Sequence, residues 1–279
     1  MSSTKEFNEY LEKHAIEKDV YLEKFEEVLK SSPQSEVEFS IKIADNKKHF
    51  TRMNIWFPQD PSRNIKHIGL INKYINEIKE NNIGLNLSIY NTLINKEFIQ
   101  RYVRFIVFGI DLRGDTSSSS IKIWFSIRRN MGLLRKLVQL SEISQGAYEI
   151  LRESAGYFPL SVCVSLGFNR ITSLKLYAKF SKKYIQEKRN YLISKFGNNI
   201  DLLLKGCSGI HISFKDSKPK IHFKQKKIFD FLRLINKLEE VEKLLPIDIE
   251  KRSSYISLEP EEINKSQVRN LTLYFLNRK

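Results

Sequence analysis

The stretch "IKIWFSI", residues 121–127, is typical of a β-strand whose two faces carry different kinds of side chain. One face is apolar and consists of Ile121, Ile123, Phe125 and Ile127. Such a face packs against a core, because alternate residues of a strand point to the same side. The other face combines Lys122 and Trp124 with a serine. A solvated face seldom carries a tryptophan and a buried face seldom carries a lysine, so the second face needs an unusual environment.

Four other predicted strands also oppose an apolar face with a face that carries charged residues, in most cases beside an aromatic ring. They are "VEFSIKI" (37–43), "FTRMNIWF" (50–57), "SLKLYAKF" (173–180) and "KIHFK" (220–224). Their polar positions hold Glu38, Ser40, Lys42, Arg52, Asn54, Trp56, Lys175, Tyr177, Lys179, Lys220, His222 and Lys224. An ordinary strand with a solvated outer face would explain any one of them. Repetition of cations and rings at a period of two favours a lumen lined by these side chains.

Paired strands alternate with helical segments along the whole chain. We expect strand pairs at 36–44 and 49–57, 102–112 and 119–128, 159–168 and 172–180, 207–214 and 219–224, and 253–258 and 268–276. We expect helices at 5–31, 64–81, 130–153, 181–204 and 226–244, with a mixed segment at 84–100. Hairpin pairs are antiparallel, which argues against a doubly wound sheet.

The predicted fold is therefore α+β: a ten-stranded antiparallel β-barrel surrounded by α-helices. Closing the sheet removes its exposed edges. A barrel of this size is too wide for side chains alone to fill, so we expect a central lumen that serves as the active site. We expect a single domain over residues 1–279, with an N-terminal helix in 1–33 and the barrel with its outer helices in 34–279.

Bulk properties limit the classes of protein that fit. The 279 residues are 41% hydrophobic, which is enough for a sizeable core. No apolar run reaches the length of a membrane span, and the charged, helical N-terminus lacks a signal-peptide core. Cys163 and Cys207 form neither a CxxC motif nor a disulfide framework. We expect a cytoplasmic monomer with no membrane partner.

The net charge of +15 calls for an anionic partner, such as a nucleic acid, an anionic membrane or a phosphorylated small molecule. The lysine-rich segments 179–196 and 224–245 have helical spacing and are typical of solvated helix faces. No RNP, KH or helix-turn-helix signature is present, so a basic nucleic-acid-binding protein is an alternative rather than the main hypothesis. We expect no nucleic-acid partner.

A lumen lined by cations, aromatic rings and one glutamate suits prenyl transfer from an allylic diphosphate. Cations bind and neutralise a diphosphate leaving group. Aromatic faces stabilise an allylic cation and exclude water. A carboxylate can take the proton of the attacking nucleophile. The chain has no DDxxD motif for Mg-diphosphate, so basic side chains would do most of the diphosphate binding.

The order and spacing of several motifs resemble the cyanobactin-type peptide prenyltransferases of the ABBA, or prenyltransferase-barrel, family. The motifs are "SEVEFSIKI" (35–43), "TRMNIWF" (51–57), "GIDLR" (109–113) followed by "SSIKIWFSI" (119–127), "LKLYAKF" (174–180), "SGIHISF" (208–214) and "VRNLTLYF" (268–275). The resemblance covers roughly residues 35–276. "GIDLR" with the strand after it is its most specific part.

The resemblance implies roles for individual residues. Glu38 matches the family's glutamate base. The diphosphate-binding positions are Arg52, Lys122, Lys175, Tyr177, Lys179, His222 and Tyr274. Some family members have acidic residues where Lys175 and Lys179 stand. His222 replaces a more usual aromatic hydroxyl, so it can either bind phosphate or pack.

Three residues would line the isoprenoid pocket. His211 stands where dimethylallyl-using members have a bulky phenylalanine, and Tyr255 lies near a common tryptophan position. Both are slightly smaller or more polar, so a geranyl donor remains open beside dimethylallyl. Trp124 would wall the prenyl chain.

The resemblance further implies transfer of a dimethylallyl or geranyl group from its diphosphate to a side chain or terminus of a ribosomally made, macrocyclic or linear peptide. Mg²⁺ would accompany the diphosphate, held mainly through it rather than by protein ligands. The alternative within enzymes is a prenyltransferase for a small aromatic acceptor, an indole or a phenol.

Overall fold

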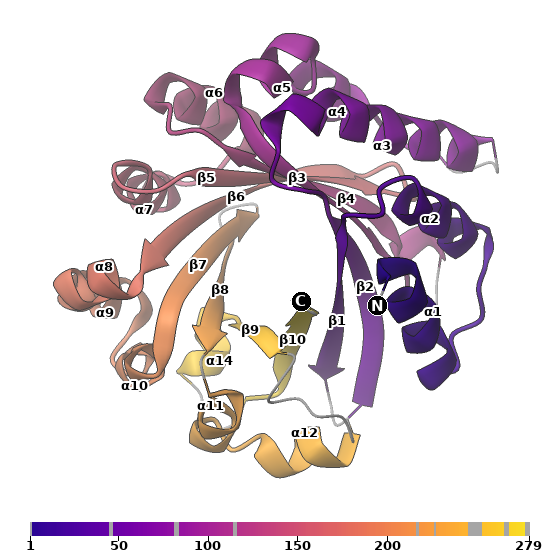
Figure 1. Ribbon diagram of the computed structural model, residues 1–279. Helices are drawn as coiled ribbons and strands as arrows, with labels where there is room; N and C mark the ends of the chain where they lie inside the picture. Colours follow the sequence, from indigo (N-terminus) through magenta and orange to yellow (C-terminus); the bar gives the residue numbers. More distant parts are fainter. Residues whose placement is uncertain are drawn as a thin grey trace. The chain divides into compact units, whose positions relative to one another are not determined.

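The computed structural model describes residues 2–44, 47–80, 84–113, 116–215, 218–225, 227–244, 253–264 and 268–276. Its strands are β1 (Glu36–Ala44), β2 (Lys47–Trp56), β3 (Val103–Asp111), β4 (Ser120–Ile127), β5 (Leu160–Gly167), β6 (Thr172–Ser181), β7 (Cys207–Lys215), β8 (Lys218–Gln225), β9 (Ser253–Leu258) and β10 (Asn270–Leu276). They form one closed antiparallel barrel in the order β1-β10-β9-β8-β7-β6-β5-β4-β3-β2 (Figure 1). The predicted fold class is confirmed.

The helices are α1 (Ser3–Lys13), α2 (Val20–Lys30), α3 (Asn64–Lys79), α4 (Ser88–Leu93), α5 (Lys96–Tyr102), α6 (Met131–Ser141), α7 (Gln145–Ala155), α8 (Lys182–Glu187), α9 (Arg189–Phe196), α10 (Ile200–Lys205), α11 (Ile228–Leu234), α12 (Leu238–Leu244) and α14 (Pro260–Ile263). Two short 3-10 turns, η1 (Pro61–Arg63) and η2 (Thr116–Ser118), complete the described elements. No helix among the described residues is long and apolar enough to cross a membrane.

Four segments predicted as continuous helices are divided, and this part of the prediction is wrong. The N-terminal segment splits into α1 and α2, and the other three split at the α6–α7, α8–α9–α10 and α11–α12 junctions. Ala15, Glu142 and Asn236 have φ near +50°, and Gly197 has a φ of 89°, so the backbone leaves the helical conformation at each of these residues. Hydrophobic periodicity continues across such breaks, which is why it did not reveal them.

The chain divides into two compact units. Unit 1 comprises Met1–Glu38, Arg52–Arg128 and Ser161–Leu174, and unit 2 comprises Phe39–Thr51, Arg129–Leu160 and Lys175–Lys279. Four of the five boundaries fall inside β1, β2, β5 and β6, and the fifth, after Arg128, falls between β4 and α6. The single domain expected over the whole chain stays a prediction.

Helices of unit 1 pack on the apolar faces of its strands. The ring of Phe108 on β3 lies 5.6 Å from Phe25 of α2 and 5.0 Å from Tyr74 of α3. On β4, Phe125 meets Phe98 of α5 edge to face, with 5.8 Å between ring centroids. The apolar face of "IKIWFSI" therefore packs against helices, as its pattern predicts.

The helices of unit 2 likewise pack on the apolar faces of its strands. Phe180 at the end of β6 stacks on Tyr184 of α8, and Phe223 of β8 lies 5.2 Å from Phe231 of α11. The Ser154 hydroxyl of α7 donates to the Lys179 carbonyl oxygen at 3.0 Å, and the Lys179 amide donates back to that hydroxyl at 2.8 Å. In both units the faces opposite these helix contacts carry the polar side chains discussed next.

Candidate active site

Strands β2, β3 and β4 bring four charged residues of unit 1 together. Pairing places Gly109 opposite both Asn54 and Lys122, and Asp111 opposite Ser120. Arg52 lies two residues before Asn54, so it shares the face of β2 that is next to Asp111. We call Arg52, Asp111, Arg113 and Lys122 the Asp111 cluster.

Asp111 is the centre of this cluster, with only 1% of its surface exposed. Its Oδ2 atom pairs with Lys122 Nζ, with Arg52 Nη2 at 3.3 Å and with Arg113 Nη2 at 3.7 Å. Burial alone would raise the pKa of Asp111, but Lys122, Arg52 and Arg113 together hold it well below its usual range. Asp111 is therefore ionised at neutral pH.

The Asp111 cluster explains how a lysine can be buried on β4. Lys122 is 6% exposed, and an isolated charge at that depth would be costly. Three cations share one carboxylate, so the cluster keeps an excess of positive charge. Guanidinium and ammonium groups with such an excess are suited to binding a phosphate group.

Trp124 is also part of this face. The Arg52 guanidinium carbon lies 5.5 Å from the centre of the Trp124 ring, a cation–π geometry. Farther along the same face, Trp56 stacks on Phe105 with 5.9 Å between centroids. The face therefore places cations beside aromatic rings, as the sequence pattern predicts for Lys122 and Trp124.

Glu38 is 4% exposed and lies at the part of β1 that belongs to unit 1. Its Oε1 atom accepts a hydrogen bond of 2.6 Å from Asn54 Nδ2. A Cβ atom at Gly109 would overlap Asn54 Oδ1 and lie 2.9 Å from the Met53 carbonyl oxygen. Glycine at 109 therefore makes room for the asparagine that contacts Glu38.

In unit 2, β6, β7 and β8 align predicted residues across the sheet. Lys179 pairs with His211, and His211 pairs with His222. On the neighbouring strands, Lys224 pairs with Tyr255 and Tyr255 pairs with Tyr274. Register thus brings most of the predicted unit 2 residues onto one face of the sheet.

Ring contacts connect these residues further. The His222 ring lies 5.8 Å from that of Tyr177 and 6.2 Å from that of Tyr274, and the rings of His211 and Tyr255 lie 5.2 Å apart. Lys175 is partly buried and shares the face of Tyr177. The predicted diphosphate and isoprenoid residues of unit 2 therefore form one contiguous group.

His222 uses both ring nitrogens within the sheet. Nε2 lies 2.9 Å from Ser213 Oγ on β7, and Nδ1 contacts Ser257 Oγ on β9. In a neutral imidazole one nitrogen donates and the other accepts, so the two hydroxyls must take opposite roles. This environment explains His222 as a packed, hydrogen-bonded residue; its binding of phosphate stays a prediction.

His211 is held neutral. Burial is the main cause that lowers its pKa to about 3, and the nearby charges of Lys179 and Lys224 lower it further. At neutral pH its ring therefore carries no charge. An uncharged ring is compatible with the predicted place of His211 beside an isoprenoid chain.

Sequence reasoning assigned no role to Asp111, Asn54, Gly109, Ser213 or Ser257. Asp111 lies within the quoted motif "GIDLR", and a carboxylate next to a strand of buried cations could have indicated it. The two serines and Gly109 carry no such signal, because their contacts depend on strand register. Among the residues that the structure describes, no three His, Cys, Asp or Glu side chains lie close enough to hold a metal ion.

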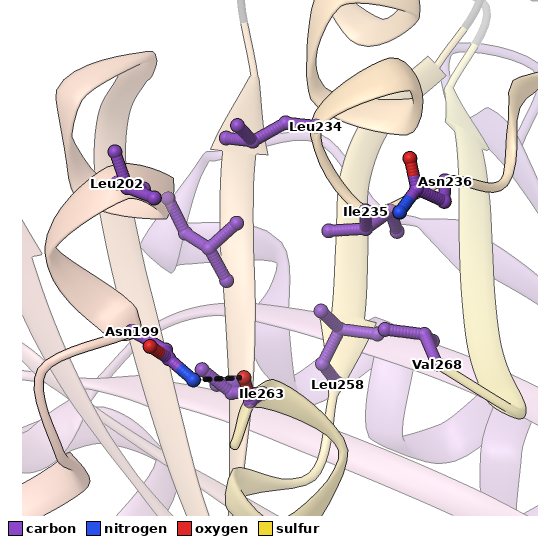
Figure 2. A pocket seen from close by; sticks show the side chains of 9 residues that line it. Asn199, Leu202, Leu234, Ile235, Asn236, Leu258, Ile263 and Val268 are labelled. Carbon is purple, nitrogen blue, oxygen red and sulfur yellow. Dashed lines mark hydrogen bonds between the residues drawn. The ribbon is translucent and has the colours of Figure 1, made fainter. Parts of the chain in front are cut away.

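A pocket of unit 2 lies apart from these groups. Figure 2 shows its mainly apolar lining, including Leu202 of α10, Leu234 of α11 and Leu258 of β9, and the hydrogen bond from Asn199 Nδ2 to the Ile263 carbonyl oxygen. Leu258 is an outward residue of β9, whereas Tyr255 and Ser257 belong to the opposite face. None of the predicted site residues lines this pocket.

The structure thus has the prenyltransferase-barrel fold. The chain belongs to the family of unknown function DUF5838, whose model matches residues 5–277. A search of curated proteins finds no match.

Among solved structures, the chain is similar to NotF in complex with brevianamide F and DMSPP. The two are 14% identical, with a TM-score of 0.55 over 98% of this chain and 92% of that chain. A structure of NotF prenyltransferase has a TM-score of 0.46 at 14% identity, over 86% of this chain and 80% of that chain. At this level of identity, the first comparison shows a shared fold.

Proposed function

We propose that the chain is a prenyltransferase that transfers an isoprenoid from an allylic diphosphate to a nucleophilic acceptor. The Asp111 cluster carries the proposal: Lys122 and Arg52 are cations on a strand face that also holds Trp124 and the Glu38–Asn54 pair. Cations, an aromatic ring and a carboxylate are the groups that ionisation of an allylic diphosphate and capture of the cation require.

In this proposal each group of unit 1 has one task. Arg52 and Lys122 bind the diphosphate and neutralise the charge that develops on it as the carbon–oxygen bond breaks. The ring of Trp124 faces the allylic cation. Glu38 takes the proton from the acceptor as the new bond forms. Mg²⁺, if it accompanies the diphosphate, would be held through diphosphate oxygens.

The same proposal assigns roles in unit 2. Tyr177, Tyr274 and His222 contact the diphosphate or shield the cation, and Lys175 and Lys179 add positive charge. His211 and Tyr255 contact the isoprenoid. The ring contacts and strand pairing that group these residues support this assignment.

Two classes of acceptor follow from different observations. Similarity in fold to a protein crystallised with brevianamide F favours a small aromatic acceptor, an indole or a phenol. The motif resemblance to cyanobactin-type enzymes favours a side chain or terminus of a peptide. The donor is dimethylallyl or geranyl diphosphate in either case.

The test incubates the protein with each donor and Mg²⁺, and separately with an indole, a phenol, free tryptophan and tyrosine, and linear and cyclic peptides. Mass spectrometry then detects a gain of one isoprene unit or two. A gain on the small aromatics alone identifies the first acceptor class, and a gain on peptides with little on free amino acids identifies the second. The absence of any gain, together with tight, salt-sensitive RNA binding, would overturn the proposal.

Glu38→Gln tests the base. The amide keeps the shape of the side chain but cannot take a proton, so we expect turnover to fall roughly a hundredfold or more while the donor still binds. Donor binding is measured with an unreactive thiolo analogue of the diphosphate. Glu36→Gln removes the same charge from the same strand and is the control, expected to retain activity. An unchanged rate in Glu38→Gln would assign the base elsewhere.

A further inference from the structure

We propose that Asn54 is a positioning residue: its side-chain amide orients the Glu38 carboxylate. The absence of a side chain at Gly109 leaves the space that this amide occupies. The inference rests on the proposed role of Glu38 as the base. It concerns three residues on three adjacent segments of unit 1, none of which touches the reacting atoms except Glu38.

Asn54 Nδ2 donates a hydrogen bond of 2.6 Å to Glu38 Oε1. This orientation of the amide fits the proposed base, because an ionised carboxylate only accepts hydrogen bonds. Asn54 Oδ1 then points toward Gly109 and has no hydrogen-bond partner within the part of the chain that the structure describes, although the residue is only 3% exposed. A buried acceptor without a partner destabilises the folded state. An apolar side chain at this position would avoid that cost.

The hydrogen bond from Asn54 restricts the terminal torsion of the Glu38 side chain. The terminal torsion of a glutamate is broad, so an unassisted carboxylate samples many orientations. The close approach to Gly109 on one side and the hydrogen bond to Glu38 on the other limit the rotation of the Asn54 amide. One oxygen of Glu38 is thereby fixed, which sets the direction of the other. Proton transfer needs a defined geometry, so an oriented carboxylate is expected to speed this step.

Two variants of Asn54 distinguish its positioning of Glu38 from a role in packing alone. Asn54→Ala removes the donor and leaves a small space. Asn54→Asp keeps the size of the side chain and its contact with Gly109 but replaces the hydrogen-bond donor with a second carboxylate. Asn64→Ala is the matched control, because Asn64, the first residue of α3, is also buried in unit 1 and its amide donates to the Val103 carbonyl oxygen at the start of β3.

The first readout is kinetic. We expect both Asn54 variants to lower kcat roughly tenfold to a hundredfold while the KM for the diphosphate donor stays within about twofold. The control is expected to lose stability but to keep kcat. A variant of Asn54 that keeps wild-type kcat in an active enzyme overturns the positioning role.

The second readout does not need activity. The Glu38 carboxyl carbon is titrated by NMR, with its signal assigned by comparison with Glu38→Gln. In Asn54→Asp the midpoint of this titration is expected to rise by roughly one pH unit or more, because two carboxylates then share one site. The charged residues Glu36 and Lys42 of β1, Arg52 of β2, Asp111 of β3 and Lys122 of β4 are the same in all variants.

The two readouts distinguish the possible failures. A titration midpoint that does not move in Asn54→Asp shows that the pair does not form and overturns the inference. A shifted midpoint in a protein that transfers no isoprenoid to any acceptor supports the Glu38–Asn54 pair and contradicts the proposed function instead.

Discussion

At the scale of single residues, Asp111 determines how the buried cations of unit 1 are held. Its one carboxylate oxygen pairs with Lys122, Arg52 and Arg113, and its pKa is lowered well below the usual range by these charges. Removal of Asp111 would leave Lys122 buried without this counter-charge. We therefore expect Asp111 to contribute to stability as well as to the arrangement of the strand face that is proposed to bind the diphosphate.

Asp111→Ala is expected to reduce the free energy of unfolding by about 3–5 kcal/mol, the typical cost of breaking a buried ion pair. Urea unfolding at neutral pH measures this loss. Asp230→Asn is the control: Asp230 forms an exposed pair with Arg233, and its change should stay within about 0.5 kcal/mol. A loss below about 1 kcal/mol for Asp111→Ala would contradict the central role of this carboxylate.

At the scale of elements, the N-terminal helices show how capping overrides periodicity. Residues 5–31 have one continuous apolar pattern, yet the chain forms α1 and α2 with a left-handed residue, Ala15, between them. The side chain of Asp19 accepts a hydrogen bond of 2.9 Å from the Leu22 amide and begins α2. A cap of this kind satisfies one of the free amides at a helix start.

Asp19→Ala is expected to lower the free energy of unfolding by about 1 kcal/mol through loss of this cap. Asp19→Asn is the matched control, because asparagine caps helices about as well as aspartate. Chemical unfolding of the two variants and the wild type measures the difference. Equal losses in both would attribute the effect to charge rather than to the cap.

At the scale of the whole molecule, the buried His67 and the partly buried His211 are expected to make the fold sensitive to acid. Burial, helped by the charges of Arg63 and Lys66, lowers the pKa of His67 to about 4. Burial, helped by the charges of Lys179 and Lys224, lowers the pKa of His211 to about 3. An unfolded histidine has a pKa of about 6.5. Between these values the unfolded chain binds more protons, so stability falls as the pH falls.

We expect the free energy of unfolding to decrease as the pH falls below about 6.5. The part of this decrease that is due to the two histidines should be complete near pH 3–4. Each histidine contributes a slope of roughly 1 kcal/mol per pH unit in this window. A His67→Phe, His211→Phe double variant should show a flatter profile by urea unfolding at pH 4, 5 and 6. His49→Phe, at an exposed histidine, is the control. A double variant with the wild-type slope would contradict this assignment.

The barrel was predictable because its signal is local. Each strand carries its own alternation, so "IKIWFSI" indicates which residues face the helices without knowledge of its neighbours. The apolar residues of this strand are fully buried, and Lys122 lies on the opposite face. Helix ends were less predictable, since single caps and left-handed residues such as Ala15 and Gly197 decide them.

By itself, the sequence determined the ten strands, their antiparallel pairing and the polar face that carries Glu38, Arg52, Lys122 and Tyr177. Only the tertiary structure decided which of these side chains meet. Several contacts join residues of different strands: the ion pairs of Arg52 and Lys122 with Asp111, the close approach of Asn54 to Gly109 and the two serine contacts of His222. Such contacts depend on the register between strands, which the residue pattern within a single strand does not specify.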